Sequence, residues 1–287
     1  MRRQHFLLLQ IKRKEKLRLA AFSKIILFYS MKFLRFTCFT LIVSACLFSV
    51  LAKAENITIK AADKKDSLAA RQLLVVVADG WNNLQGSLYA YNKVGSKWIL
   101  QFSNPIVLGE KGLGLGNGLM PITIDNVPIK KEGDLRAPAG VFSIGTAFGN
   151  AAYKDVNWIN NRYIMCTDTL ICVDDLHSVN YNKLVKTDTA TKDYNSHEDM
   201  LMEKIYYKWG LFVNYNTNKI PGNGSCIFIH IWGNDHEGTW GCTAMKEDDM
   251  VRILRWIKSS DNPLLVQLPK IEYMKFSAQY GFPEIKF

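Results

Sequence analysis

The sequence has no uninterrupted apolar run of the eighteen or more residues that each helix of a multi-span membrane protein requires. It also lacks the low hydrophobicity and the low-complexity segments of a disordered chain, since 48% of its 287 residues are hydrophobic. A polytopic membrane protein and a disordered protein are therefore excluded. The length accommodates one or two domains with a sizeable core.

Charge is balanced once the N-terminal region is set aside. The chain carries 36 Lys and Arg against 26 Asp and Glu, a net charge of +10. Residues 1–54 contain eleven of the basic residues and one acid, Glu15, so that 25 of each sign remain from Glu55 onward. This remainder lacks the basic footprint of a DNA- or RNA-binding protein, and we expect no nucleic-acid partner.

Residues 31–54 have the three parts of a secretory signal peptide. Lys32 and Arg35 form a positive start, residues 37–51 are uncharged and mostly apolar, and Ala52-Lys53-Ala54 is a small-x-small cleavage site. The apolar part is short for a membrane span, so we expect cleavage and no stable membrane insertion afterwards. Lipidation at Cys46 is the alternative.

This interpretation divides the chain into four parts. Residues 1–30 are an upstream extension or a misassigned start, residues 31–54 the signal peptide, residues 55–68 a polar linker and residues 69–287 a single domain. The predicted location is the periplasm or cell envelope.

Cys-x-x-Cys spacing is absent, which removes the usual signature of a zinc ribbon or a thioredoxin-like site. Four cysteines remain after signal cleavage: Cys166, Cys172, Cys226 and Cys242. In an oxidising compartment four cysteines predict two disulfides; the alternative is one reduced nucleophile and a pair among the other three. Strands over 162–165 and 170–173 would form a hairpin that places Cys166 opposite Cys172.

Apolar and β-branched runs predict a β-rich domain. Strands are expected over 72–77, 87–91, 97–102, 137–145, 209–214, 225–232 and 264–268. Helices are expected over 196–207 and from about Lys246, where apolar residues recur at helical spacing. The glycine-dense segment 109–118 is predicted to be a flexible surface loop, because Met120-Pro121 prevents the helix that a dinucleotide site needs.

Cys242 and His230 form a candidate catalytic pair. His230 is the polar residue near the end of an apolar strand, and Cys242 follows it in a glycine-containing loop shortly before a predicted helix. A helix N-terminus lowers a thiol pKa, and an imidazole is the usual base for a cysteine nucleophile. The main-chain N–H groups of Gly241 and Cys242 are suited to an oxyanion hole. Taken singly, a buried Cys and a lone His are more often structural.

The segment His230…Thr239-Trp240-Gly241-Cys242 resembles the His…[Ser/Thr]-x-Gly-Cys signature of L,D-transpeptidase catalytic domains. Residues 137–142, 172–175, 225–232 and 263–269 are similar to further segments of that family, and the resemblance covers nearly all of residues 70–270. It implies a mainly β fold with a few helices (α+β), built as a β-sandwich-like mixed sheet in one domain.

The resemblance also implies an activity, cysteine acyl transfer on peptidoglycan stem peptides without metal or other cofactor. Cys242 is the implied nucleophile, His230 the general base and then acid, Gly241 an oxyanion donor, and Thr239 the support of the loop. Release to an amine gives an L,D-transpeptidase and release to water an L,D-carboxypeptidase. Carbapenem-type inhibitors are expected to acylate Cys242.

Substrate recognition follows the family less closely. Many members have His at the place of Trp240 and Arg at the place of Ala244. Arg136 or Arg162 would then supply the positive charge, or residues 174–177 would meet a substrate amine. The candidate substrate contacts are Trp240, His236, Arg136 and Trp232.

Three rival functions remain. A sortase also has His before Cys, but its Thr-Leu-x-Thr-Cys strand and following Arg strand are not found in this sequence. A catalytically silent peptidoglycan-binding module would keep the fold without a reactive thiol. A disulfide-stapled structural domain would pair Cys242 with Cys226.

Overall fold

Eight strands of the chain form a sheet that closes on itself. A computed structural model describes residues 69–201 and 205–286. The sheet order is β10-β11-β12-β3-β2-β1-β13-β5, and β10 also pairs with β5, which closes a barrel-like arrangement. The strands are β1 (Gln72–Ala78), β2 (Gln85–Val94), β3 (Lys97–Val107), β5 (Ala137–Gly149), β10 (Trp209–Val213), β11 (Phe228–Ile231), β12 (Thr243–Met245) and β13 (Leu264–Pro269).

β1 and β13 form the buried centre of this sheet. β1 runs antiparallel to β2 and parallel to β13, and every residue of β1 and β13 is buried. Strands that are buried on both faces have continuous apolar sequences, which is why these two strands could be predicted from the sequence. The mainly β, single-domain prediction is confirmed.

Closure of the sheet depends on a close approach between β10 and β5. Gly210 pairs with Phe148, and a Cβ atom on Gly210 would lie 2.2 Å from the Phe148 ring. A glycine in a strand allows such an approach. The described residues therefore form a closed mixed sheet where a sandwich-like one was expected, because the β10–β5 pairing is set by long-range contact.

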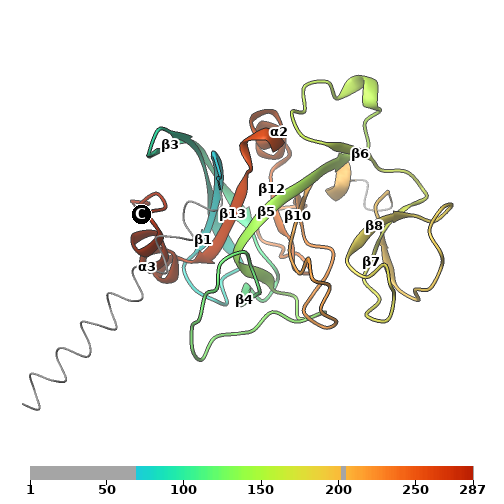
Figure 1. The fold of residues 1–287 in the computed structure, drawn as a ribbon, viewed down its shortest axis with the longest axis horizontal. Coiled ribbons are helices and arrows are strands. Elements are labelled where there is room, and N and C mark those ends of the chain that lie inside the picture. The colour runs from blue at the N-terminus through green and yellow to red at the C-terminus, as the bar shows by residue number, and fades with distance from the viewer. Residues whose placement is uncertain (1–68, 202–204, 287) are drawn as a thin grey trace, which may run out of the picture. The chain divides into compact units, whose positions relative to one another are not determined.

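A second sheet of three strands lies on the other side of the barrel from the C-terminal helix (Figure 1). Its order is β8-β7-β9, with β7 at Leu170–Val173, β8 at Lys183–Lys186 and β9 at His197–Asp199. β6 (Tyr163–Met165) pairs with β5 of the barrel and not with β7. The predicted hairpin of residues 162–173 is therefore wrong, because its two strands belong to different sheets.

Two further predictions need correction. Of the segment 196–207, His197–Asp199 is strand β9 and Tyr206–Lys208 a 3₁₀ turn, η3, because the main chain of β9 pairs with the open edge of β7. The glycine-dense segment 109–118 is partly internal: β4 (Leu113–Leu115) runs parallel to β5, and Leu113 is fully buried.

Two helices complete the described chain. α2 (Glu247–Trp256) confirms the helix predicted from about Lys246, and it buries Met250, Ile253 and Leu254. α3 (Lys270–Tyr280) was not predicted and begins directly after the last strand. No helix within the described residues is both long and apolar enough to span a membrane. The predicted extension, signal peptide and linker lie outside the described residues.

Candidate functional site

Cys242 and His230 lie on the same outer face of the barrel. β11 and β12 are parallel neighbours, with Ile229 paired to Thr243 and His230 paired to Ala244. Continuing this register places Cys242 beside Phe228, two residues along the strand from His230. Side chains alternate between the faces of a strand. Ile229, Ile231 and Met245 face the barrel core, so His230 and Cys242 face outward.

The Cys242 thiol is buried and hydrogen-bonded to the main chain. Its Sγ accepts the Phe228 N–H at 3.3 Å and donates toward the Cys226 carbonyl oxygen at 3.7 Å. Burial raises the pKa of this thiol well above its usual range, and the Glu198 carboxylate raises it further. The Phe228 N–H and the Lys130 ammonium act in the opposite direction.

The expected effect of a helix N-terminus on this thiol is wrong. β12 lies between Cys242 and α2, which begins only at Glu247. The influence of a helix terminus falls off within its first turn. The resting thiol is therefore protonated, with burial as the dominant influence on its pKa.

His230 is held as a neutral imidazole. Its Nδ1 lies 2.8 Å from the carbonyl oxygen of Ile231. A carbonyl only accepts, so Nδ1 carries the hydrogen and Nε2 is left as the basic nitrogen. Burial lowers the pKa of His230 to about 4, although the Ile231 hydrogen bond acts in the opposite direction. Among the described residues Cys242 and His230 share no hydrogen bond, and the Tyr207 ring packs edge-on 5.3 Å from the imidazole.

Thr239 fixes the loop that carries Cys242. Its hydroxyl donates to the Cys242 carbonyl oxygen at 2.7 Å and accepts the Gly241 N–H at 3.2 Å. These two hydrogen bonds are consistent with the role that the resemblance implied for Thr239, support of the cysteine loop. The Gly241 N–H is engaged by this hydroxyl, so an oxyanion would have to compete with Thr239 for it. Gly241 itself has a φ of +140°, a region that favours glycine.

The four candidate substrate contacts are placed very differently. Trp240 is 87% exposed beside the cysteine loop. His236 is exposed and forms a contact with Asp235 at 3.2 Å. Trp232 is half-buried at the end of β11. The guanidinium of Arg136 donates to three main-chain carbonyls and to the Asn82 side chain, so it anchors neighbouring loops.

The alternative candidates also differ in their surroundings. Arg162 is exposed and lines an open cavity of about 500 Å³ between β5 and β8. The Asp175 carboxylate accepts main-chain N–H groups from His177 and Asn195. These hydrogen bonds lower the pKa of Asp175 and fit a carboxylate that holds a turn.

Residues 69–201 and 205–286 contain one disulfide and two free cysteines. Cys172 of β7 is bonded to Cys226, and Cys166 and Cys242 are buried free thiols. The prediction of two disulfides is therefore wrong, and the alternative with one pair and a reduced Cys242 is correct. The bond joins the small sheet to the segment that leads into β11. All four cysteines lie in one apolar cluster on the outer face of the barrel.

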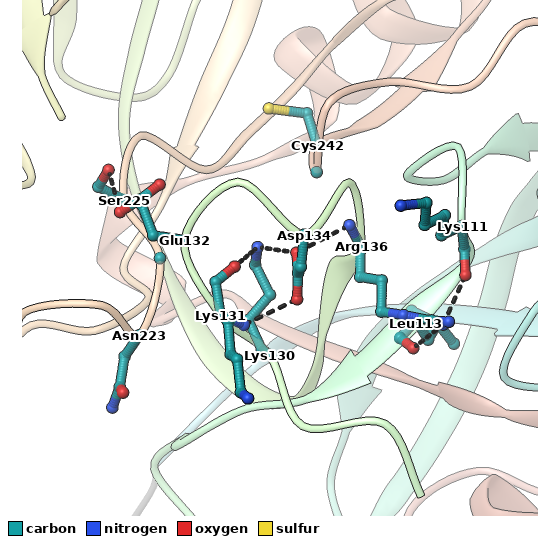
Figure 2. A network of polar contacts seen from close by, with 12 residues as sticks. Lys111, Leu113, Lys130, Lys131, Glu132, Asp134, Arg136, Asn223, Ser225 and Cys242 are labelled. Carbon is teal, nitrogen blue, oxygen red and sulfur yellow. Dashed lines mark hydrogen bonds and ion pairs between the residues drawn. The ribbon is translucent and has the colours of Figure 1, made fainter. Parts of the chain in front are cut away.

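Sequence reasoning missed three charged residues near Cys242. Glu198 on β9 of the small sheet raises the pKa of the Cys242 thiol, and the Glu198 carboxylate accepts a hydrogen bond from the Tyr207 hydroxyl at 2.8 Å. Lys130 and Asp134 form a buried ion pair in the turn that lies below the cysteine loop in Figure 2. All three occur in ordinary polar segments, so no local pattern distinguishes them. No group of three or more potential metal ligands is found among the described side chains.

Comparison with known proteins finds no matching family model and no matching curated protein. Among solved structures, the chain is similar to Bd1075 of Bdellovibrio bacteriovorus, with 11% identity over 69% of this chain and 47% of that one and a TM-score of 0.35. It is also similar to the helical cell shape determining protein Pgp2 of Campylobacter jejuni, with 14% identity over 75% of this chain and 55% of that one and a TM-score of 0.36. The chain spans about half the length of these two proteins. Likeness at this level assigns neither site residues nor an activity to this chain.

Proposed function

We propose that the chain is a cell-envelope cysteine acyltransferase that acts on peptidoglycan stem peptides, as an L,D-transpeptidase. The observation that carries this proposal is the state of His230, whose Nδ1 hydrogen is held by Ile231 and whose Nε2 is basic on the face shared with free Cys242. The peptide substrate and the envelope location come from the sequence motif and the signal-peptide pattern.

In the proposed reaction, Cys242 Sγ attacks the stem-peptide carbonyl between an L-centre and a D-residue. His230 Nε2 takes the thiol proton, so the high pKa of the resting thiol is overcome only as the carbon–sulfur bond forms. The imidazolium then gives this proton to the leaving amine, and a thioester remains on Cys242. An acceptor amine or water releases the acyl group and the thiol is restored.

A second candidate, the catalytically silent peptidoglycan-binding module, is favoured by two observations. Burial raises the pKa of the Cys242 thiol, and this thiol hydrogen-bonds to main-chain groups and not to His230. Catalytic hydrogen bonds in apo enzymes are often long or poorly aligned, so an acyltransferase is compatible with the same two observations. The two differ in whether Cys242 accepts an acyl group.

The test is intact-protein mass spectrometry after incubation with a carbapenem. The wild type is expected to gain one covalent adduct, and Cys242→Ala none. Cys166→Ala is the matched control, because it removes the other buried free thiol and should keep the adduct. His230→Ala should slow acylation by about 100- to 10,000-fold, the usual contribution of a general base.

Two outcomes would reject the acyltransferase. Absence of any adduct on folded wild type with a reduced Cys242 would select the silent module, and an adduct that persists in Cys242→Ala would remove the assigned nucleophile. Incubation of the wild type with a tetrapeptide-bearing muropeptide, with and without an acceptor amine, then separates transfer from the carboxypeptidase reaction.

A further inference from the structure

Lys130 is a charged side chain that the proposed mechanism does not use. Only 3% of this side chain is exposed, although lysine is almost never fully buried without a partner. Its Nζ donates to Asp134 Oδ1 at 2.6 Å and to the Lys131 carbonyl oxygen at 2.7 Å. Its third hydrogen has no acceptor within the described parts of the chain.

The Lys130 ammonium lies beneath the loop that presents Cys242. A Cβ atom placed on Gly241 would lie 3.7 Å from Lys130 Nζ and 3.1 Å from the Arg136 carbonyl oxygen. Figure 2 shows Cys242 above the turn that holds Lys130, Asp134 and Arg136, with its sulfur directed away from that turn. The ammonium thus approaches the nucleophile loop at Gly241, the one residue of the loop that has no side chain.

The Asp134 carboxylate, which neutralises Lys130, also accepts hydrogen bonds from two main-chain N–H groups. The Asp134 carboxylate accepts hydrogen bonds from Lys130 Nζ and from the main-chain N–H groups of Lys131 and Arg136. These contacts hold the carboxylate within its own turn, and the Lys130 ammonium lies between this carboxylate and the Gly241 loop. Low local dielectric makes a charge in such a position more effective than one at the surface.

We infer that Lys130 is a positioning residue of the proposed acyltransferase site, whose buried ammonium supports Gly241 and supplies a fixed positive charge that favours negative charge on the Cys242 sulfur. This inference rests on the proposed function for its catalytic meaning. The predicted effect of the Lys130 charge on the Cys242 thiol does not depend on that function. The groups that act on this thiol come from three sides: Glu198 on β9 opposes the negative charge, while the Phe228 N–H on β11 and Lys130 favour it.

The test is the alkylation rate of Cys242 by iodoacetamide in the full chain, resolved by peptide mass spectrometry at fixed pH. Below the thiol pKa this rate follows the fraction of thiolate. Lys130→Gln removes the charge and keeps a donor for Asp134, and we expect Cys242 to react about 3- to 10-fold more slowly. Lys130→Arg retains the charge and should stay within about twofold of the wild type.

Cys166 serves as the control within the same molecule. Burial raises its pKa to about 12, and a hydrogen bond from the Gly149 main chain lowers it; Lys130 is not among the groups that act on it. A slower Cys242 with an unchanged Cys166 and a preserved rate in Lys130→Arg supports the inference. An unchanged or faster Cys242, a parallel change in both cysteines, or a Lys130→Arg rate as low as that of Lys130→Gln overturns it.

A double variant keeps the inference testable where Lys130→Gln does not fold. Lys130→Met with Asp134→Asn removes both charges together and leaves no unpaired buried ion. It is expected to slow Cys242 alkylation by a smaller factor than Lys130→Gln, because the opposing Asp134 charge is removed as well, and a wild-type rate overturns the inference. Because alkylation needs no peptide substrate, its result is independent of carbapenem acylation. If carbapenem does not acylate Cys242 but Lys130→Gln still slows its alkylation, the proposed acyltransferase function is rejected and the inference about Lys130 is kept.

Discussion

The Thr239 hydroxyl donates a hydrogen bond to the Cys242 carbonyl oxygen at 2.7 Å, and this bond closes the loop of residues 239–242. The same hydroxyl accepts the Gly241 N–H, so one side chain satisfies polar groups on both sides of the peptide that precedes the nucleophile. The thiol position therefore depends on a side chain three residues away.

Thr239→Val tests this dependence. The substitution keeps the shape of the side chain and removes both hydrogen bonds, so we expect a loss of about 1–3 kcal/mol in the free energy of unfolding. Carbapenem acylation of Cys242 should slow in parallel. Thr239→Ser keeps the hydroxyl and is expected to behave like the wild type in urea denaturation and in the acylation assay. A fully active, fully stable Thr239→Val protein would contradict the assigned role.

Gly241→Ala tests the backbone of the same loop. Gly241 has a φ of +140°, and a new Cβ atom would lie 3.1 Å from the Arg136 carbonyl oxygen. Strain at such a position costs about 1–3 kcal/mol. Gly95→Ala is the matched control, since Gly95 also has a positive φ but no atom within 4 Å of the added Cβ. Only the Gly241 variant should lose reactivity at Cys242, as read by adduct formation.

The Cys172–Cys226 disulfide closes a sequence separation of 54 residues. The entropy of a closed loop of this length corresponds to about 4 kcal/mol. Cys172→Ala with Cys226→Ala is therefore expected to lower the free energy of unfolding by up to about this amount, measured by urea denaturation. In Cys166→Ala, addition of reductant should still destabilise the protein, whereas the double variant should not respond to reductant. A reductant response that persists in the double variant would contradict the pairing.

The buried neutral His230 predicts a specific pH dependence of stability. The unfolded chain binds the His230 proton near pH 6.5, and the folded chain only near pH 4. The His230 contribution to the free energy of unfolding is thus fully present above pH 6.5. It is lost as the pH drops toward 4, because the unfolded state binds more protons in that window. The His230 contribution to this loss is about 3 kcal/mol.

His230→Gln isolates this contribution from that of the carboxylates. The free energy of unfolding should fall less steeply between pH 6.5 and 4 in the variant than in the wild type. Superimposable slopes would show that His230 titrates normally in the folded protein. In the proposed reaction, the acid limb of the acylation rate should likewise lie near pH 4, below that of an ordinary histidine.

Local sequence determined those features whose physical causes are local. β1 and β13 are continuous apolar runs, and α2 shows helical spacing with acids at its start, so each was predicted from its own residues. The order of His230, Thr239, Gly241 and Cys242 singled out the segment that the fold brings to one face of β11 and β12.

Tertiary structure decided everything that depends on contact between distant segments. The closure of β10 on β5, the assignment of β9 to a strand and the choice of Cys226 as the partner of Cys172 each join segments with no shared local pattern. The direction of the Cys242 pKa is another such feature, because burial and Glu198 raise it against the opposite effect of Lys130, and neither charged residue is near Cys242 in sequence. Hydrophobic periodicity is a property of neighbours along the chain, whereas desolvation and charge proximity are properties of the folded interior.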